Sequence, residues 1–388
     1  MFDFDKPVNR ENTASVKWDL REETFGTKEV LPMWVADMDF ESPECIQKAI
    51  QERAKHPVYG YSFMTDGYFE AFIQWVKRRH GWNIKKDWII FSPGIVTAFN
   101  AAIWAFTDPG DGVIVQPPVY FPFFSAIRHN NRKQLDNQLL LIDQHYEIDF
   151  DDFEAKAKQA KVFLMSSPHN PVGRCWTREE LKRIGEICLK HQVIIISDEI
   201  HADLILPGHQ HTPTALISEE LAEMTVTCMA PSKTFNVAGL FTSQIVIQNE
   251  KLRKKFVSAM ESFHLVHGNL FGYIASEAGY QCGDDWLDAL MIYIKENFDR
   301  VDNFLKNEIP SIKLTRAEAT FLAWLDFSGT GFSGKKLNEK IIRDAGLGLS
   351  PGRVFGAGGE SFMRMNLGTQ RQLVEKALLN LKKAFKKY

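Results

Sequence analysis

A lysine in the stretch 229–240 is the side chain of this sequence best placed for covalent chemistry. Lys233 follows an apolar run of β-strand character at residues 225–229, and small or hydroxylated residues surround it. Such surroundings remove an amine from water, which lowers its pKa towards nucleophilic reactivity. The simplest product is a Schiff base between Lys233 and an aldehyde. The alternative is an ordinary surface or ion-paired lysine.

An acidic residue at the end of another apolar run would complement such an aldehyde. Asp198 closes the run 193–197, which has no polar alternation and therefore predicts a central strand buried on both faces. A buried carboxylate needs a cationic partner, because burying it alone is costly. A protonated pyridine nitrogen would be such a partner, so Lys233 and Asp198 together suggest pyridoxal 5′-phosphate. An ion pair with an arginine is the alternative for Asp198.

Two further residues are candidates to contact the ring of this cofactor. Asn170 lies in the turn 166–173, which also contains two prolines and a glycine. In this turn it is placed to hydrogen-bond a phenolate oxygen. Tyr120 begins an aromatic run and is a candidate to stack on the ring. The alternatives are a plain turn asparagine and a tyrosine that packs in the core.

A phosphate needs hydrogen-bond donors, and the predicted helix start at residues 94–97 supplies them. The free backbone N–H groups of Ile95 and Val96, together with the helix dipole, favour an anion, although every helix start offers the same. Ser232 or Thr234, on either side of Lys233, is expected to add a hydroxyl group.

Arg364 is a charge inside the apolar strand predicted at residues 362–366. An arginine in such a place requires a fixed anion, and the carboxylate of an amino-acid substrate suits its two parallel N–H donors. A structural salt bridge is the alternative.

The elements that must position these residues alternate along the chain. This alternation predicts a doubly wound, mostly parallel α/β sheet, in which ligands bind beyond the carboxyl ends of the strands. A smaller α/β domain is expected to follow at the C-terminus. The predicted division is an N-terminal arm with part of the small domain at 1–44, a large cofactor-binding domain at 45–288 and the small domain at 289–388. The predicted strands lie at 88–91, 113–115, 139–142, 162–165, 193–197, 225–229, 244–247, 320–326 and 362–366.

Composition excludes several other classes of protein. The 388 residues carry a net charge of −3 with both signs interspersed, so we expect no nucleic-acid or anionic-membrane partner. No apolar run reaches the roughly 20 residues that cross a bilayer, and the N-terminus does not resemble a secretory signal. The five scattered cysteines are predicted to be reduced thiols, and the protein is predicted to be cytoplasmic.

Three motifs in this order carry a family resemblance. They are Pro-His-Asn-Pro-Val-Gly-Arg at 168–174, Ser-Asp-Glu-Ile-His-Ala-Asp-Leu at 197–204 and Ser-Lys-Thr-Phe-Asn at 232–236. Together they resemble fold-type I pyridoxal-phosphate enzymes of the class I/II aminotransferase superfamily. The second motif is similar to that of the MalY/PatB-like cystathionine β-lyases, a C–S lyase branch. The similarity extends from about residue 18 to the C-terminus.

The resemblance implies a role for each candidate. Lys233 would form the Schiff base, Asp198 would hold the pyridine nitrogen, and Asn170 would bind the 3′-oxygen. Many aminotransferases have a phosphate-binding serine three residues before the lysine. Ala230 occupies that place here, so Ser232 is expected to substitute. The resemblance also implies a homodimer with shared active sites. The remaining implied roles are Tyr120 on the ring, Ile95, Val96 and the partner's Tyr61 on the phosphate, His201 at the cofactor, and Arg364, Tyr120 and Asn170 at the amino-acid substrate.

Three functions stay open at this point. The first is a C–S β-lyase that cleaves L-cystathionine or cysteine S-conjugates to a thiol, pyruvate and ammonia. The second is an aminotransferase. No arginine can be placed for a substrate's side-chain carboxylate, which weakens only an aspartate-specific transaminase. The third is a cofactor-bearing regulatory protein whose lyase activity is incidental.

Overall fold

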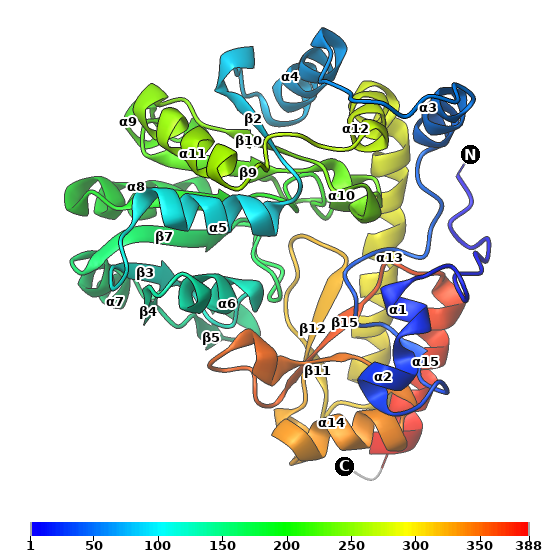
Figure 1. Cartoon of the computed structure of the whole chain (residues 1–388). Helices are drawn as coiled ribbons and strands as arrows, with labels where there is room; N and C mark the ends of the chain where they lie inside the picture. The colour runs from blue at the N-terminus through cyan, green and yellow to red at the C-terminus, as the bar shows by residue number, and fades with distance from the viewer. Residues whose placement is uncertain (1, 387–388) are drawn as a thin grey trace.

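A seven-stranded sheet in the order β2-β10-β9-β8-β7-β3-β4 forms the centre of the larger part of the protein (Figure 1). The computed structural model describes residues 2–386. The pairs from β9 to β4 are parallel, whereas β10 is antiparallel to both of its neighbours. The predicted fold class is therefore confirmed. The strands are β2 (Ile89–Ser92), β3 (Gly112–Val115), β4 (Lys133–Asp136), β7 (Ala160–Ser166), β8 (Ile194–Asp198), β9 (Thr225–Met229) and β10 (Ser243–Val246).

Alternate residues of the central strands face opposite layers of helices. On β7, Val162 and Leu164 belong to one apolar cluster, whereas Phe163 and Met165 belong to another. Because both faces are covered, these strands are apolar throughout rather than alternating. The first cluster includes α5 (Ile95–Phe106), α6 (Pro122–His129) and α11 (Glu250–Ser262), and the second includes α7 (Phe150–Ala157), α8 (Arg178–His191) and α9 (Glu219–Ala222).

A four-stranded sheet, β11-β12-β15-β14, forms a second layer near the C-terminus. The long helix α13 (Asp284–Glu308) runs alongside both parts of the molecule in Figure 1. It passes through residue 288 without a break, and the predicted domain division stays a prediction. The elements here are β11 (Lys313–Leu314), β12 (Leu322–Asp326), α14 (Gly334–Arg343), β13 (Leu347–Gly348), β14 (Ser350–Pro351), β15 (Phe362–Asn366) and α15 (Arg371–Phe385).

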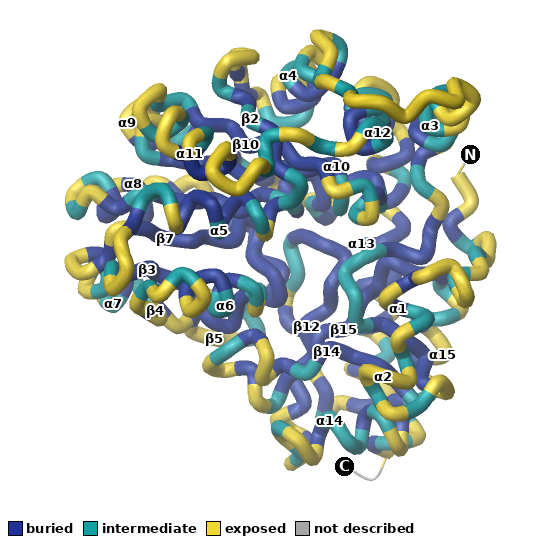
Figure 2. The backbone as a smooth tube through the Cα atoms, in the orientation of Figure 1, coloured by how far each residue is buried: buried dark blue, intermediate teal, exposed yellow. Residues whose placement is uncertain are grey.

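The N-terminal arm packs on this second part. Its strand β1 (Leu31–Pro32) pairs in parallel with β13, and the short helices α1 (Val16–Asp19) and α2 (Arg21–Phe25) precede it. Beside the large sheet, α12 (Leu270–Cys282) packs against both α3 (Glu44–Ala54) and α4 (Asp66–His80). The segment between α3 and α4 is largely exposed (Figure 2).

Several local predictions need correction. The strand predicted at 139–142 lies outside the large sheet, because β5 (Leu140–Ile142) forms a hairpin with β6 (His145–Glu147). The edge strand β4 was not predicted, because its sequence Lys-Gln-Leu-Asp is mostly polar and exposed. Helix α8 begins with a capping box, in which the side chains of Thr177 and Glu180 each accept a hydrogen bond from the other's backbone N–H.

The cysteine prediction is also wrong for one pair. Cys45 on α3 and Cys282 at the end of α12 form a disulfide. The pairing is invisible in the sequence, because 237 positions separate the two residues and only the packing of α3 on α12 brings them together. Cys175, Cys188 and Cys228 are free and buried. Within residues 2–386, no helix is both long and apolar enough to span a bilayer.

Candidate functional site

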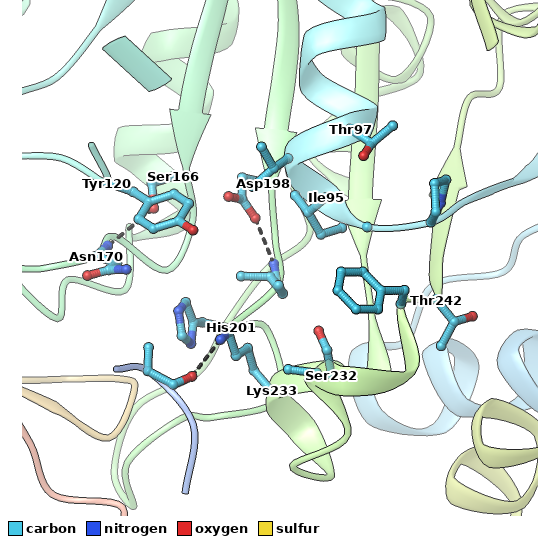
Figure 3. A pocket seen from close by; sticks show the side chains of 17 residues that line it. Ile95, Thr97, Tyr120, Ser166, Asn170, Asp198, His201, Ser232, Lys233 and Thr242 are labelled. Atoms are coloured by element: carbon cyan, nitrogen blue, oxygen red, sulfur yellow. Dashed lines mark hydrogen bonds between the residues drawn. The ribbon is translucent and has the colours of Figure 1, made fainter. Parts of the chain in front are cut away.

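A cavity of about 310 Å³ lies at the carboxyl ends of the parallel strands (Figure 3). The large sheet delivers most of the predicted residues to it, because consecutive parallel strands end at one edge. Of the residues predicted from the sequence, those that line the cavity are Ile95, Val96, Tyr120, Asn170, Asp198, His201, Ser232 and Lys233.

Lys233 lies on α10 (Pro231–Thr234), a single helical turn directly after β9. Its Nζ donates a hydrogen bond to the backbone oxygen of Ala36, which belongs to the N-terminal arm. Burial, together with the positive charge of Arg364, lowers the pKa of Lys233 to about 8 against the opposing effects of Asp37 and Asp198. A larger fraction of the amine is therefore uncharged near neutral pH than for a lysine in water.

Asp198 ends β8 and is 4% exposed. It accepts a hydrogen bond from the backbone N–H of Ile200 at 3.2 Å, and no cation in residues 2–386 forms an ion pair with it. Burial raises the pKa of Asp198 to about 7, since the hydrogen bond and the more distant Lys233 compensate only in part. This carboxylate lacks the cationic partner that its burial requires.

Arg364 lies on β15, outside the large sheet, and is not one of the cavity-lining residues, but it contacts Asn170, which is. Its Nη1 donates to Asn170 Oδ1 at 3.1 Å, and its Nη2 donates to the backbone oxygen of Trp34 at 2.9 Å. The side chain is buried, its Nε has no partner, and no carboxylate in the described chain forms an ion pair with it. Burial lowers the pKa of Arg364 to about 10. A buried guanidinium with neutral partners suits an incoming carboxylate.

The first turn of α5 borders the same cavity, with Gly94 as its N-cap and without a side-chain cap. Its free N–H groups and the helix dipole create a site for an anion. The hydroxyl-bearing residues Thr97, Ser232 and Thr242 also line the cavity. Within residues 2–386, Lys233 is the only lysine or arginine among the lining residues, so backbone N–H groups and hydroxyls would supply most contacts to a phosphate.

His201 and Tyr120 complete the inner wall (Figure 3). His201 is 3% exposed, and its Nδ1 has no hydrogen-bond partner. Burial lowers the pKa of His201 to about 3, with Lys233 and Arg364 adding to the effect, so the ring is neutral. Tyr120 lines the cavity and also packs edge to face on Phe123 at 6.1 Å, so it takes part in both the cavity wall and the core.

Tyr61, like Arg364, is a predicted site residue outside the cavity lining, and unlike Arg364 it contacts no lining residue in the described chain. It is fully exposed on the segment between α3 and α4, outside the cavity lining.

Some residues that line the cavity could not be identified as site residues from the sequence. Ser166 holds the Asn170 turn, since its Oγ accepts from the Asn170 backbone N–H at 3.2 Å. Ala36 contributes a backbone oxygen, which any residue carries. Phe241 and Thr242 enter the wall just before β10, which runs antiparallel and therefore begins where its neighbours end.

Comparison with known proteins agrees with this arrangement. The sequence pattern described as "Aminotransferase class I and II" matches residues 28–381. This chain belongs to the class I and II aminotransferase family.

Related proteins align with this chain over nearly its whole length. Cystathionine beta-lyase PatB of Bacillus subtilis is 45% identical over 383 residues, which are 98% of this chain and 99% of PatB. The structure of cystalysin from Treponema denticola, which contains pyridoxal 5′-phosphate, superposes with a TM-score of 0.97 at 39% identity and covers 100% of this chain and 99% of cystalysin. A pyridoxal-phosphate-bound C–S lyase from Staphylococcus hominis gives a TM-score of 0.93 at 33% identity, with 99% and 98% of the two chains covered.

The cavity of this family member fits pyridoxal 5′-phosphate. Asp198 lacks a cation, which a protonated pyridine nitrogen would provide. Lys233 has a lowered pKa, as a Schiff-base amine requires, and the start of α5 accepts an anion. Each unsatisfied group therefore has a counterpart on the cofactor.

Proposed function

We propose that this protein is a pyridoxal-phosphate-dependent C–S β-lyase, which cleaves L-cystathionine or cysteine S-conjugates to a thiol, pyruvate and ammonia. The observation that carries the cofactor assignment is the buried, unpaired Asp198 in the same cavity as Lys233. The lyase assignment is supported by the 45% identity to a cystathionine β-lyase across the whole chain.

Residues in and beside the cavity have separate roles in this reaction. When bound, the cofactor supplies an electron-poor ring that accepts the electron pair left at the substrate's Cα, and Asp198 keeps that ring protonated. Arg364 binds the substrate carboxylate, and Asn170, hydrogen-bonded to Arg364, lies beside it.

Lys233 moves the proton in this scheme. Its amine, when not bonded to the cofactor, would remove the Cα proton of the substrate. The overall reaction breaks the Cβ–S bond, releases the thiol with the bonding electron pair, and consumes one water to give pyruvate and ammonia. A pKa near 8 allows Lys233 to act as the base at neutral pH.

A second copy of the chain would complete the site. The exposed segment between α3 and α4 carries Val58, Tyr59, Tyr61 and Phe63, and Phe241 is exposed at the cavity wall. An apolar group of this kind is typical of a covered surface. We therefore place Tyr61 at the phosphate of the partner's cofactor in a homodimer. Mixing inactive Tyr61→Ala and Lys233→Ala subunits should restore activity if the sites are shared, and no restoration would contradict the sharing.

The deciding experiment for the reaction uses purified holoenzyme and L-cystathionine without any 2-oxo acid. Pyruvate release that disappears in Lys233→Ala supports the lyase. The aminotransferase alternative, which the family pattern favours, predicts turnover only when a 2-oxo acid is added. Cofactor binding without pyruvate release would overturn the lyase assignment but keep the cofactor.

A further inference from the structure

A buried carboxylate lies behind Lys233, outside the groups used above. Asp203 accepts a hydrogen bond from Thr234, the residue after Lys233, through Thr234 Oγ1 and Asp203 Oδ2 at 2.7 Å. Its other oxygen lies 3.0 Å from Trp75 Nε1 and 2.9 Å from His80 Nε2. Trp75 and Thr234 are fully buried, and the side chains of Asp203 and His80 are about 5% exposed or less. Asp203 therefore joins α10 to α4.

The three residues that follow Lys233 are each held by a different part of the protein. Thr234 is bound by Asp203. Phe235 packs against Gly279 and Gly283 at α12, where an added Cβ would come within 3 Å of its ring. Asn236 adopts a φ of 58° and donates to the backbone oxygens of Met38 and Phe40. A one-turn helix cannot fix its own direction, so these anchors set where Lys233 points.

A second buried pair of a carboxylate and a histidine lies next to Asp198. Glu199 follows Asp198 and lies 2.8 Å from His211 Nε2, while its other oxygen accepts from Ser197 and from the backbone N–H of Thr214. The rings of His80 and His211 meet edge to face at 5.7 Å. The supports of Lys233 and Asp198 are therefore in contact with each other.

We propose that Asp203 is a positioning residue for Lys233, acting through the hydroxyl of Thr234. A buried carboxylate costs desolvation energy, so an apolar contact would serve stability alone at least as well. What the carboxylate adds is direction, because its two oxygens bind α10 on one side and α4 on the other. The charges that shift the Lys233 amine are those of Asp37, Arg364 and Asp198, which indicates that Asp203 acts by geometry. The inference rests on the proposed role of Lys233.

The test compares Thr234→Val, which keeps the shape and removes the hydroxyl, with Thr234→Ser, which keeps the hydroxyl. The first readout is the rate at which apoprotein takes up pyridoxal 5′-phosphate covalently, trapped with borohydride and measured by mass. The second is the separation of kcat from KM with L-cystathionine. A misplaced amine should slow uptake and lower kcat by about 10- to 100-fold, with KM changed by less than about twofold. Thr234→Ser should stay close to wild type.

A matched control removes a histidine–carboxylate pair elsewhere. Glu154 on α7 lies 3.2 Å from His191 on α8, and neither lines the cavity. Glu154→Gln should leave both readouts unchanged. Asp203→Ala, which removes both acceptor oxygens, serves as the second variant if Thr234→Val does not fold, and it should show the same slow uptake and low kcat.

The outcomes separate cleanly. Wild-type rates in Thr234→Val or Asp203→Ala, with or without a lower melting temperature, would overturn the positioning role and leave a structural hydrogen bond. Failure of the wild-type chain to take up the cofactor would instead overturn the proposed function, and this inference with it.

Discussion

Two groups of buried charges in this protein differ in how they are neutralised. In the N-terminal arm, Lys17 is fully buried and its Nζ lies 2.7 Å from Asp39 Oδ2, while Arg10 lies 2.9 Å from Asp39 Oδ1. At the cavity, Asp198 in the lining and Arg364 behind Asn170 are equally buried but form no ion pair within residues 2–386. The arm therefore holds paired charges, and the cavity holds unpaired ones.

The pKa values record the same difference. Burial alone would raise the pKa of Asp39, but Lys17, Trp18 and Arg10 outweigh it and hold that pKa below the ordinary value. For Asp198 burial wins, and its pKa rises to about 7. Charges that are paired within the chain stabilise the fold, whereas charges left unpaired indicate a site that a ligand completes.

The largest expected effect comes from removing the unpaired amine. Lys233→Ala should lower the release of pyruvate from L-cystathionine by at least about 1,000-fold, because both the covalent attachment and the base are lost. The apoprotein should unfold at the same or a higher urea concentration, since a poorly paired buried amine has been removed. A large loss of stability would instead indicate that Lys233 stabilises the fold.

Removing a paired charge should have the opposite effect. Lys17→Met leaves Asp39 with one cation fewer and should lower the free energy of unfolding by about 3 kcal/mol. Urea titration of the apoprotein measures this. Lys6→Met is the control, because the Lys6–Glu41 pair is exposed and should contribute little. Equal stability of the two variants would contradict the comparison.

A substitution of Arg364 tests whether this buried charge binds the carboxylate of the substrate. Arg364→Lys keeps the charge but loses the parallel N–H donors, so KM should rise about 10- to 100-fold, as expected for one or two lost charged hydrogen bonds. Steady-state kinetics with L-cystathionine checks this. An unchanged KM with lower stability would make Arg364 a structural residue.

The smallest effect is on how stability depends on pH. Between about pH 4 and 7 the folded apoprotein keeps a proton on Asp198 that the unfolded chain has released, so Asp198 makes stability fall as pH rises. Asp39 has a lowered pKa, so its contribution is present above its ordinary pKa of 3.8 and is lost as pH falls below it. Urea titrations at several pH values should show that Asp198→Asn removes the first slope only. A fall that persists in Asp198→Asn would show that another group causes it.

The sequence by itself determined the strand and helix alternation and most of the cavity. Apolar runs predicted β8 and β9, and the polar residues Asp198 and Lys233 at their ends belong to the cavity because parallel strands end at one edge. A local signal also predicted the start of α5, since the residues at 94–97 that open this helix lie within one short segment.

Only the tertiary structure decided which charges are paired. Lys17 and Lys233 are both lysines near apolar residues, and neither sequence position shows which of them meets a carboxylate. The disulfide between Cys45 and Cys282, the backbone oxygen of Ala36 at Lys233 and the contact from Asp203 to Thr234 likewise join distant segments. Such contacts depend on how whole elements pack. A local sequence pattern does not specify which distant segment will pack against it.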